Sequence, residues 1–191
     1  MYGLVIPAFA SIGFLAGASL CGPGREGLTM LPKPQMSPIR GIVLVRWTRF
    51  VTTMARNPAS YASPRGRYGM FGMDMRRLSD VGFAQKPRKG SMNGEVGVWV
   101  GEWASPLTEK IYTASKPIQY ESFKRSMVRL APKARQYVGA VVDGKVCSLS
   151  GLLGVGHHAG ESGIASWVKN PDIRKKFSTT SATFNNTNGM F

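Results

Sequence analysis

The two histidines of this 191-residue chain, His157 and His158, are adjacent and lie in the glycine-rich stretch SGLLGVGHHAG. Neighbouring side chains point about 100° apart on a helix and to opposite faces on a strand, so the pair is poorly placed to bind one metal ion, and we expect no metal site. The sequence offers no Gly-x-Ser-x-Gly turn for nucleophilic chemistry. Because glycines recur at helical spacings, we predict close packing, with one histidine hydrogen-bonded to a loop and the other bordering a groove.

Basic residues outnumber acidic ones by 25 to 10, which gives a net charge of +15 and predicts attraction to polyanions. The excess is greatest in residues 61–90, which carry seven basic and two acidic side chains. This basic stripe consists of Arg65, Arg67, Arg76, Arg77, Lys86, Arg88 and Lys89. No helix-turn-helix, zinc-finger or RNP-type pattern accompanies the stripe, so a nucleic-acid-binding surface and a solvated basic face both stay open.

The only cysteines, Cys21 and Cys147, lie far apart in dissimilar settings. They therefore form neither a disulfide framework nor a paired-cysteine zinc motif. A single bridge between the two stays open, and the redox compartment cannot be inferred from them.

The N-terminal segment, residues 1–20, is apolar and uncharged, and the first basic residue is Arg25. A cleaved signal or lipid anchor, a membrane-inserting segment and an apolar arm buried against a partner are three interpretations of it. The arm is favoured because a basic start is lacking and glycine and proline interrupt the segment. Residues 22–40 contain four prolines and three glycines and are typical of a linker. We therefore divide the chain into an arm with its linker (1–40), a domain (41–170) and a polar tail (171–191).

The domain is expected to begin with an amphipathic helix in residues 40–57, which Asn57-Pro58 would end. Its apolar positions, at helical spacing, are Val43, Trp47, Phe50, Val51 and Met54. A loop or hairpin-like stretch follows, and then a short helix over residues 74–83, with Asp74 placed to cap its start. Residues 84–98 are expected to form a loop.

Pro106 and Pro117 each suit the first position of a helix and predict two further helices. The second helix carries an apolar stripe made of Ile118, Phe123, Met127 and Leu130. The polar C-terminal sequence STTSATFNNTNGMF is expected to wrap a neighbouring protein or to stay mobile. Because little of the sequence alternates with a period of two, we predict a mainly α domain.

Several segments carry, in order, motifs of one family. They are Tyr61, RYGMFGMDMRRLSDVGF at 67–83, Trp103, Gln119, QYVG at 136–139 and SLSGLLGVGHHAGESGIASWV at 148–168. From about residue 45 to 170 the chain thus resembles the lysozyme-like, lytic-transglycosylase-type domains encoded by phages and by bacterial injection systems. The resemblance implies a lysozyme-like helical fold with an extended N-terminal arm and a C-terminal tail. It also implies a former sugar groove framed by Tyr61, Tyr68, Met70, Phe71, His157 and His158.

The departure from this family concerns its catalytic acid. Glycosidic cleavage needs a carboxylic acid at the end of the first helix, whereas this chain has no Asp or Glu between Glu26 and Asp74. Arg56 and Asn57 stand in that region, and neither can hold a transferable proton at neutral pH. Unless a carboxylate such as Glu102 reaches the site from a later loop, the hydrolytic chemistry is absent.

We therefore expect a structural component of a bacteriophage virion, in the tail or baseplate, that contacts other virion proteins and uses no cofactor. One alternative is an active tail-associated peptidoglycan-degrading enzyme, a glycosidase or lytic transglycosylase that uses Glu102. Another is a DNA-contacting internal virion protein, which the basic stripe would favour. Peptidoglycan, DNA and, through residues 1–20, a membrane stay open as partners.

Overall fold

Seven helices and three two-stranded antiparallel sheets make up the part of the chain that the computed structural model describes, residues 37–191. In chain order they are α1 (Leu44–Met54), β1 (Arg67–Tyr68), β2 (Met73–Asp74), α2 (Met75–Asp80), β3 (Ala84–Met92), β4 (Glu95–Trp103), α3 (Glu109–Ala114), α4 (Lys116–Arg135), β5 (Val141–Val142), β6 (Lys145–Val146), α5 (Leu149–Lys169), α6 (Pro171–Lys176) and α7 (Ser178–Thr187). About 52% of the described residues are helical. The chain is therefore a mixed α/β protein in which helices prevail, and the prediction of a mainly α domain is correct only in part.

Helix α1 forms where the apolar periodicity predicted it. Trp47, Phe50, Val51 and Met54 are buried along one face of the helix. Val43, which was predicted to belong to that face, is instead the N-cap residue and is 61% exposed. The helix ends before Asn57-Pro58, because a proline disfavours helical backbone geometry at the residue that precedes it.

The segment after α1 is a small hairpin followed by a capped helix, as predicted. Strands β1 and β2 pair with Tyr68 opposite Met73. Asp74 is the N-cap of α2, and its Oδ1 accepts a hydrogen bond from the Arg77 backbone N–H at 2.8 Å. This cap fixes the start of α2 directly beside the hairpin.

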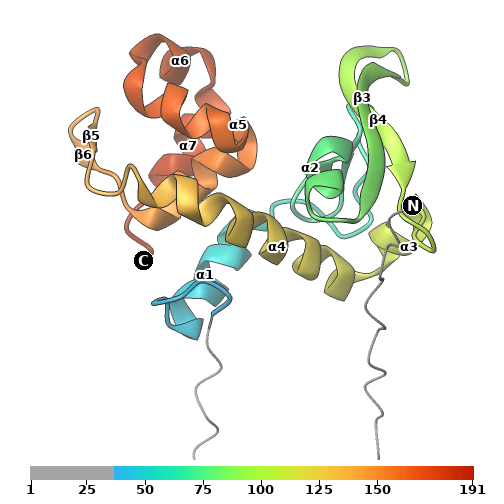
Figure 1. Ribbon diagram of the computed structural model, residues 1–191, viewed down its shortest axis with the longest axis horizontal. Helices are drawn as coiled ribbons and strands as arrows, with labels where there is room; N and C mark the ends of the chain where they lie inside the picture. Colours follow the sequence, from blue (N-terminus) through green and yellow to red (C-terminus); the bar gives the residue numbers. More distant parts are fainter. Residues whose placement is uncertain (1–36) are drawn as a thin grey trace, which may run out of the picture. The chain divides into compact units, whose positions relative to one another are not determined.

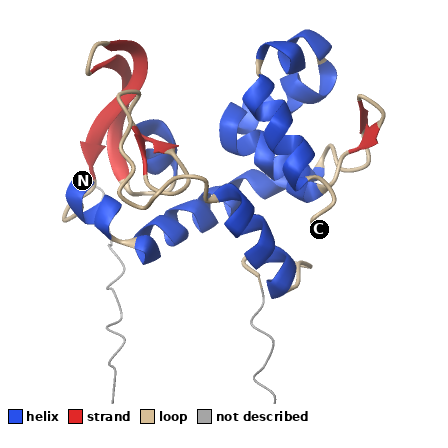
Figure 2. Ribbon diagram, turned by 180° about the vertical axis from the view of Figure 1, so that it is seen from behind, coloured by secondary structure: helices blue, strands red, loops and turns tan. Residues whose placement is uncertain are grey.

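The prediction of a loop at residues 84–98 is wrong. The segment forms the long hairpin β3–β4, which projects from the helices (Figure 2). Its turn is Asn93-Gly94, and both residues have positive φ angles, 48° and 83°, as a type I′ turn requires. Most side chains of β3 are exposed on both faces, and two irregularities interrupt the register, so no alternation of apolar and polar residues marks the strands.

Helix α4 runs beneath both the β3–β4 region and the C-terminal helices (Figure 1), and it contacts α2, α3 and α5. Ser115 caps it and Pro117 lies in its first turn, which confirms that prediction. Phe123, Met127 and Leu130 are buried along its length. Pro106, in contrast, lies in the loop before α3, because Thr108 is the N-cap of that helix.

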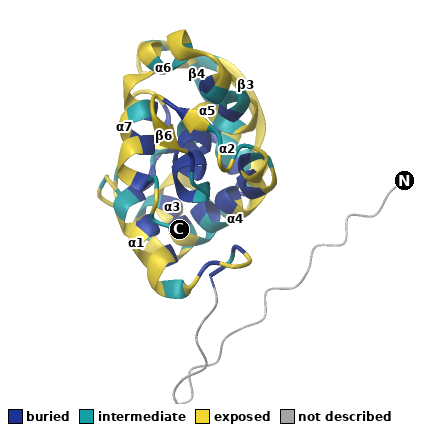
Figure 3. Cartoon of the chain, turned by 90° about the vertical axis from the view of Figure 1, so that its left-hand side faces the viewer, coloured by how far each residue is buried: buried dark blue, intermediate teal, exposed yellow. Residues whose placement is uncertain are grey.

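The expected polar tail at residues 171–191 instead forms helices α6 and α7. Helix α7 packs against α5, and Figure 3 shows the interior that these helices enclose. Thr183 and Thr187 are buried, and each hydroxyl donates a hydrogen bond to the carbonyl four residues earlier. Helix α7 can therefore pack in the interior, because its threonine hydroxyls are hydrogen-bonded within the helix and Phe184 is buried. Its sequence alone is typical of a polar tail.

The predictions for residues 1–36, including the apolar arm and Cys21, lie outside the described residues. Cys147 is buried. Within residues 37–191, no helix combines the length and the apolar character that crossing a membrane would require.

Candidate functional site: an arginine-lined groove

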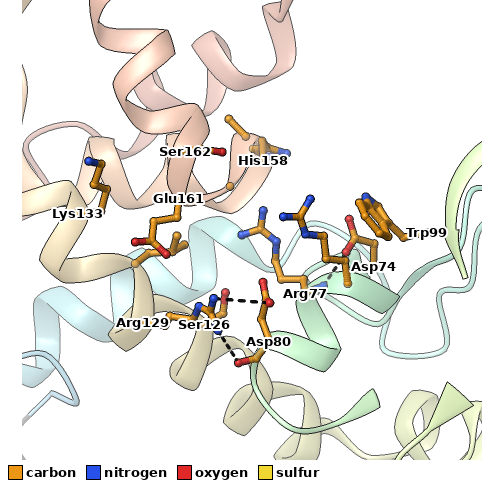
Figure 4. Close-up of a pocket in the computed structure, with 14 residues that line it drawn as sticks. Asp74, Arg77, Asp80, Trp99, Ser126, Arg129, Lys133, His158, Glu161 and Ser162 are labelled. Atoms are coloured by element: carbon orange, nitrogen blue, oxygen red, sulfur yellow. Dashed lines mark hydrogen bonds and ion pairs between the residues drawn. The ribbon is translucent and has the colours of Figure 1, made fainter. Parts of the chain in front are cut away.

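A groove lies where α1, the β1–β2 hairpin, α2, α4 and α5 meet. It has an inner compartment of about 190 Å³ and an outer compartment of about 510 Å³. Asp74, Arg77 and His158 line both compartments and so join them. The inner compartment is also lined by Arg56 and Asn57, which follow α1, whereas the outer one is lined by Trp99 of β4 (Figure 4).

Gln119 of α4 holds the loop that contributes Tyr61 and Arg67 to the inner compartment. This fully buried amide accepts a hydrogen bond from the Met70 backbone N–H at 2.8 Å. It also donates hydrogen bonds to the carbonyl oxygens of Ala59 and Tyr112, both at 2.9 Å. Gly69 has a φ of +69°, and a Cβ there would lie 2.6 Å from Gln119 Oε1. One side chain therefore ties both ends of the segment from residue 59 to residue 70 to the long helix.

His157 is part of the packing beneath the groove. Its Nε2 lies 2.7 Å from the Phe71 carbonyl oxygen, and since a carbonyl only accepts, Nε2 carries the proton. The imidazole makes an edge contact with Phe123, which stacks on Phe71 with ring centroids 4.1 Å apart. The other nitrogen, Nδ1, is buried without a hydrogen-bond partner.

His158 borders both compartments and reaches α7, where its Nε2 lies 3.0 Å from the Thr183 hydroxyl oxygen. Burial, followed by the charges of Arg56, Arg67 and Arg77, lowers the pKa of His158 to about 4. Burial, followed by the charges of His158 and the neighbouring arginines, lowers the pKa of His157 well below its usual value. Both imidazoles are consequently neutral at pH 7.

Arginines dominate the inner compartment. Arg56, Arg67 and Arg77 all line it, and none of them forms an ion pair with another described residue. Arg77 donates a hydrogen bond from Nη1 to the Gly156 carbonyl oxygen at 2.8 Å. Burial lowers the pKa of the Arg77 guanidinium, with a partial opposing effect of Asp74, but an arginine keeps its charge in proteins. The compartment thus presents fixed positive charge.

The outer compartment is less uniform. Arg129 is 3.7 Å from the Asp80 carboxylate, and Lys133 and Glu161 line the wall opposite Trp99 (Figure 4). The Trp99 ring has the Arg76 guanidinium 4.7 Å and the Lys89 ammonium 4.6 Å from its centroid. Positive charge therefore continues from the inner compartment along α2 to the β3–β4 hairpin.

The groove brings together only some of the residues that the sequence indicated. Tyr61, Phe71, His157 and His158 line the inner compartment. Tyr68 and Met70 are buried, at 2% and 7% exposure, and line neither compartment.

The basic stripe divides in the same way. Arg67, Arg76 and Arg77 line the groove. Lys86, Arg88 and Lys89 are exposed on β3, and Arg65 lies 3.5 Å from Glu95. Sequence reasoning did not indicate Trp99, Arg129 or Lys133, which line the outer compartment.

The carboxylate proposed as a fallback acid, Glu102, lies away from the groove. It is exposed on β4, pairs with Lys86 at 2.9 Å, and lines neither compartment. Among the described residues, Asp74 is the one carboxylate of the inner compartment, and its Oδ1 is engaged as the cap of α2. No three His, Cys, Asp or Glu side chains within residues 37–191 cluster in a way that could hold a metal ion.

No protein-family model, curated protein or solved structure matches this chain.

Proposed function

We propose that this protein is a structural component of a bacteriophage virion, in the tail or baseplate, built on a lysozyme-like domain that has lost its catalytic acid. The observation that carries the proposal concerns the segment directly after α1. Its polar residues Arg56 and Asn57 line the inner compartment, and neither can donate a proton to a glycosidic oxygen.

The arrangement of the motif-bearing segments supports the lysozyme-like assignment. The stretch at 148–168 is far in the sequence from Tyr61 and the stretch at 67–83, yet all three contribute to the same inner compartment. Gln119, which belongs to another motif of the family, fixes the loop between them. Segments that resemble one family in their order thus also meet around one groove, as a shared sugar-binding ancestry would require.

The loss of catalysis is tested on purified peptidoglycan, by zymogram and by clearing of a suspension, with a known muramidase as the positive control. We expect no clearing by the full chain. Asp74→Asn keeps an N-cap residue on α2, and Glu102→Gln changes an exposed side chain, so both variants should fold. Clearing by the parent chain that disappears in either variant would establish an active enzyme and refute the proposal.

The structural role is tested on particles of a phage that encodes this chain. Mass spectrometry of purified particles should find the protein at a fixed ratio to the tail proteins, and tailless particles should lack it. Its absence from complete particles, or its presence only in cell lysates, would contradict a virion role even if the groove is inactive.

A further inference from the structure

We propose that the groove binds a single strand of nucleic acid, with one backbone phosphate held in the inner compartment among Arg56, Arg67 and Arg77, and with a base next to Trp99. The proposal does not depend on the virion role or on the lysozyme resemblance, because it rests on the charges and contacts of the groove itself.

The first step concerns the phosphate. Arg56, Arg67 and Arg77 converge around His158 from three different segments: the loop that follows α1, strand β1 and helix α2. The only described carboxylate in the same compartment, Asp74, accepts a hydrogen bond from a backbone N–H and forms no ion pair. Guanidinium groups bind phosphate oxygens through paired N–H donors, so three of them without partner anions form a donor site that suits a phosphate.

The second step concerns continuity. The outer compartment shares Arg77 and His158 with the inner one and adds Arg76 and Trp99. The Arg76 guanidinium and the Lys89 ammonium lie over the Trp99 ring, 4.7 Å and 4.6 Å from its centroid, so a base that stacks on the ring must displace one of these cations. A groove that follows a charged backbone and offers an aromatic ring to a base is the usual design of a single-strand-binding surface.

The third step favours a single strand over a duplex. Arg77 is half-buried and lines both compartments, so a phosphate reaches its guanidinium from within the groove. The flexible backbone of a single strand can enter, whereas the phosphates of a rigid duplex can touch only the exposed rim at Arg56, Arg67 and Arg76.

The experiment uses the full chain and a labelled oligothymidylate of about 12 nucleotides, with binding followed by fluorescence anisotropy at several salt concentrations. The test variant is Arg56→Gln with Arg67→Gln. The matched control is Arg46→Gln with Arg49→Gln, which removes the same charge from exposed positions of α1 that do not line the groove.

We expect the groove variant to weaken binding by roughly tenfold and to reduce the salt slope by about 0.7, the change expected for one lost phosphate contact. The control variant should change affinity by less than about threefold, as expected for a loss of long-range attraction alone. Trp99→Leu should weaken oligothymidylate binding by at least about fivefold, because a stacked base is lost. It should leave the binding of inorganic polyphosphate, which has no bases, unchanged.

Three results would overturn the proposal. The first is an equal loss of affinity in the groove and control variants, which would mean that net charge alone is responsible. The second is an affinity for polyphosphate or polyglycerol phosphate equal to that for oligothymidylate, combined with no effect of Trp99→Leu on oligothymidylate binding. This result would mean that the groove binds phosphate without a preference for nucleic acid. The third is tighter binding of a duplex than of the single strand. Far-ultraviolet circular dichroism of every variant, measured alongside, separates loss of binding from loss of fold.

Discussion

The neutral histidine pair makes the stability of the folded protein depend on pH. His157 and His158 have lowered pKa values, chiefly because both are buried, whereas in the unfolded chain each should titrate near the usual value of 6.5. Below that value the unfolded state therefore binds protons that the folded state does not. The contribution of the two histidines to the free energy of unfolding is fully present above about pH 7. It is lost as the pH decreases toward their pKa values in the folded state.

The size of this loss in the free energy of unfolding depends only on the histidine pKa in the unfolded chain, as long as the pKa in the folded protein lies well below the pH of the measurement. Between about pH 7 and about pH 5.5, linkage gives a loss of about 1.2 kcal/mol for each histidine, or about 2.5 kcal/mol for the pair. Carboxylates titrate mainly below this range, so the window isolates the histidines. A domain of this kind commonly has a free energy of unfolding of about 5–15 kcal/mol, so the change is large enough to measure.

The assay is urea unfolding followed by tryptophan fluorescence across that pH window, in a buffer without phosphate so that an anion in the groove does not interfere. His158→Gln keeps an N–H donor for Thr183 and removes one titrating group, so the loss in this variant should fall to about 1.2 kcal/mol. A loss below about 0.5 kcal/mol in the parent chain, or an undiminished loss in the variant, would refute the inference that both imidazoles are buried and neutral.

Three further predictions concern the packing that shapes the groove. Gln119→Leu should lower the free energy of unfolding by about 3 kcal/mol, because it leaves buried backbone groups without partners, and a chemical denaturation curve that matches the parent would contradict this role. Gly154→Ala should destabilise by about 1–3 kcal/mol, since its Cβ would lie 2.6 Å from Thr187 Oγ1, and the added change Thr187→Ala should restore part of the loss if that contact is the cause. Deletion of residues 178–191 should abolish cooperative thermal unfolding, because α7 covers α5, and a truncated chain that still unfolds in one sharp transition would show that this segment is a dispensable tail.

The helices that bury one face could be predicted from sequence because burial leaves a periodic pattern. α1 and α4 show such a pattern, and the N-cap of α2 at Asp74 follows from residue type and position. The β3–β4 hairpin leaves no such pattern, since few of its side chains enter the core. Its one local signal was the Asn93-Gly94 dipeptide, which strongly favours a two-residue hairpin turn.

Helix α7 could not be distinguished from a mobile tail for a different reason. Its interior face is formed largely by threonines, whose hydroxyl groups bond to the backbone of their own helix. Hydropathy counts these residues as polar, although Thr180, Thr183 and Thr187 are buried. The sequence showed the glycines of α5, such as Gly151 and Gly154, that allow α7 to approach closely. It did not show which helix packs against them.

The components of the groove could be predicted one by one but not together. Arg67 and Arg77 belonged to the basic stripe, the histidines to a family resemblance, and Arg56 only to the place of a missing acid. Their convergence depends on how α1, the β1–β2 hairpin and α5 pack, which no local pattern encodes. Trp99 was missed because it lies in the hairpin whose strands carry no recognisable alternation.

The charge of the inner compartment bears on acid catalysis as well as on anion binding. A general acid of a glycosidase must stay protonated in a partly apolar environment until it donates its proton. A carboxylate placed at position 56 would meet Arg67 and Arg77, whose positive charges favour its ionised form. Such a group would form ion pairs rather than hold a proton, so an acid introduced at this position would not by itself supply glycosidase chemistry. The arginines thus make the compartment unsuitable for acid catalysis and, by the same charge, suitable for an anion.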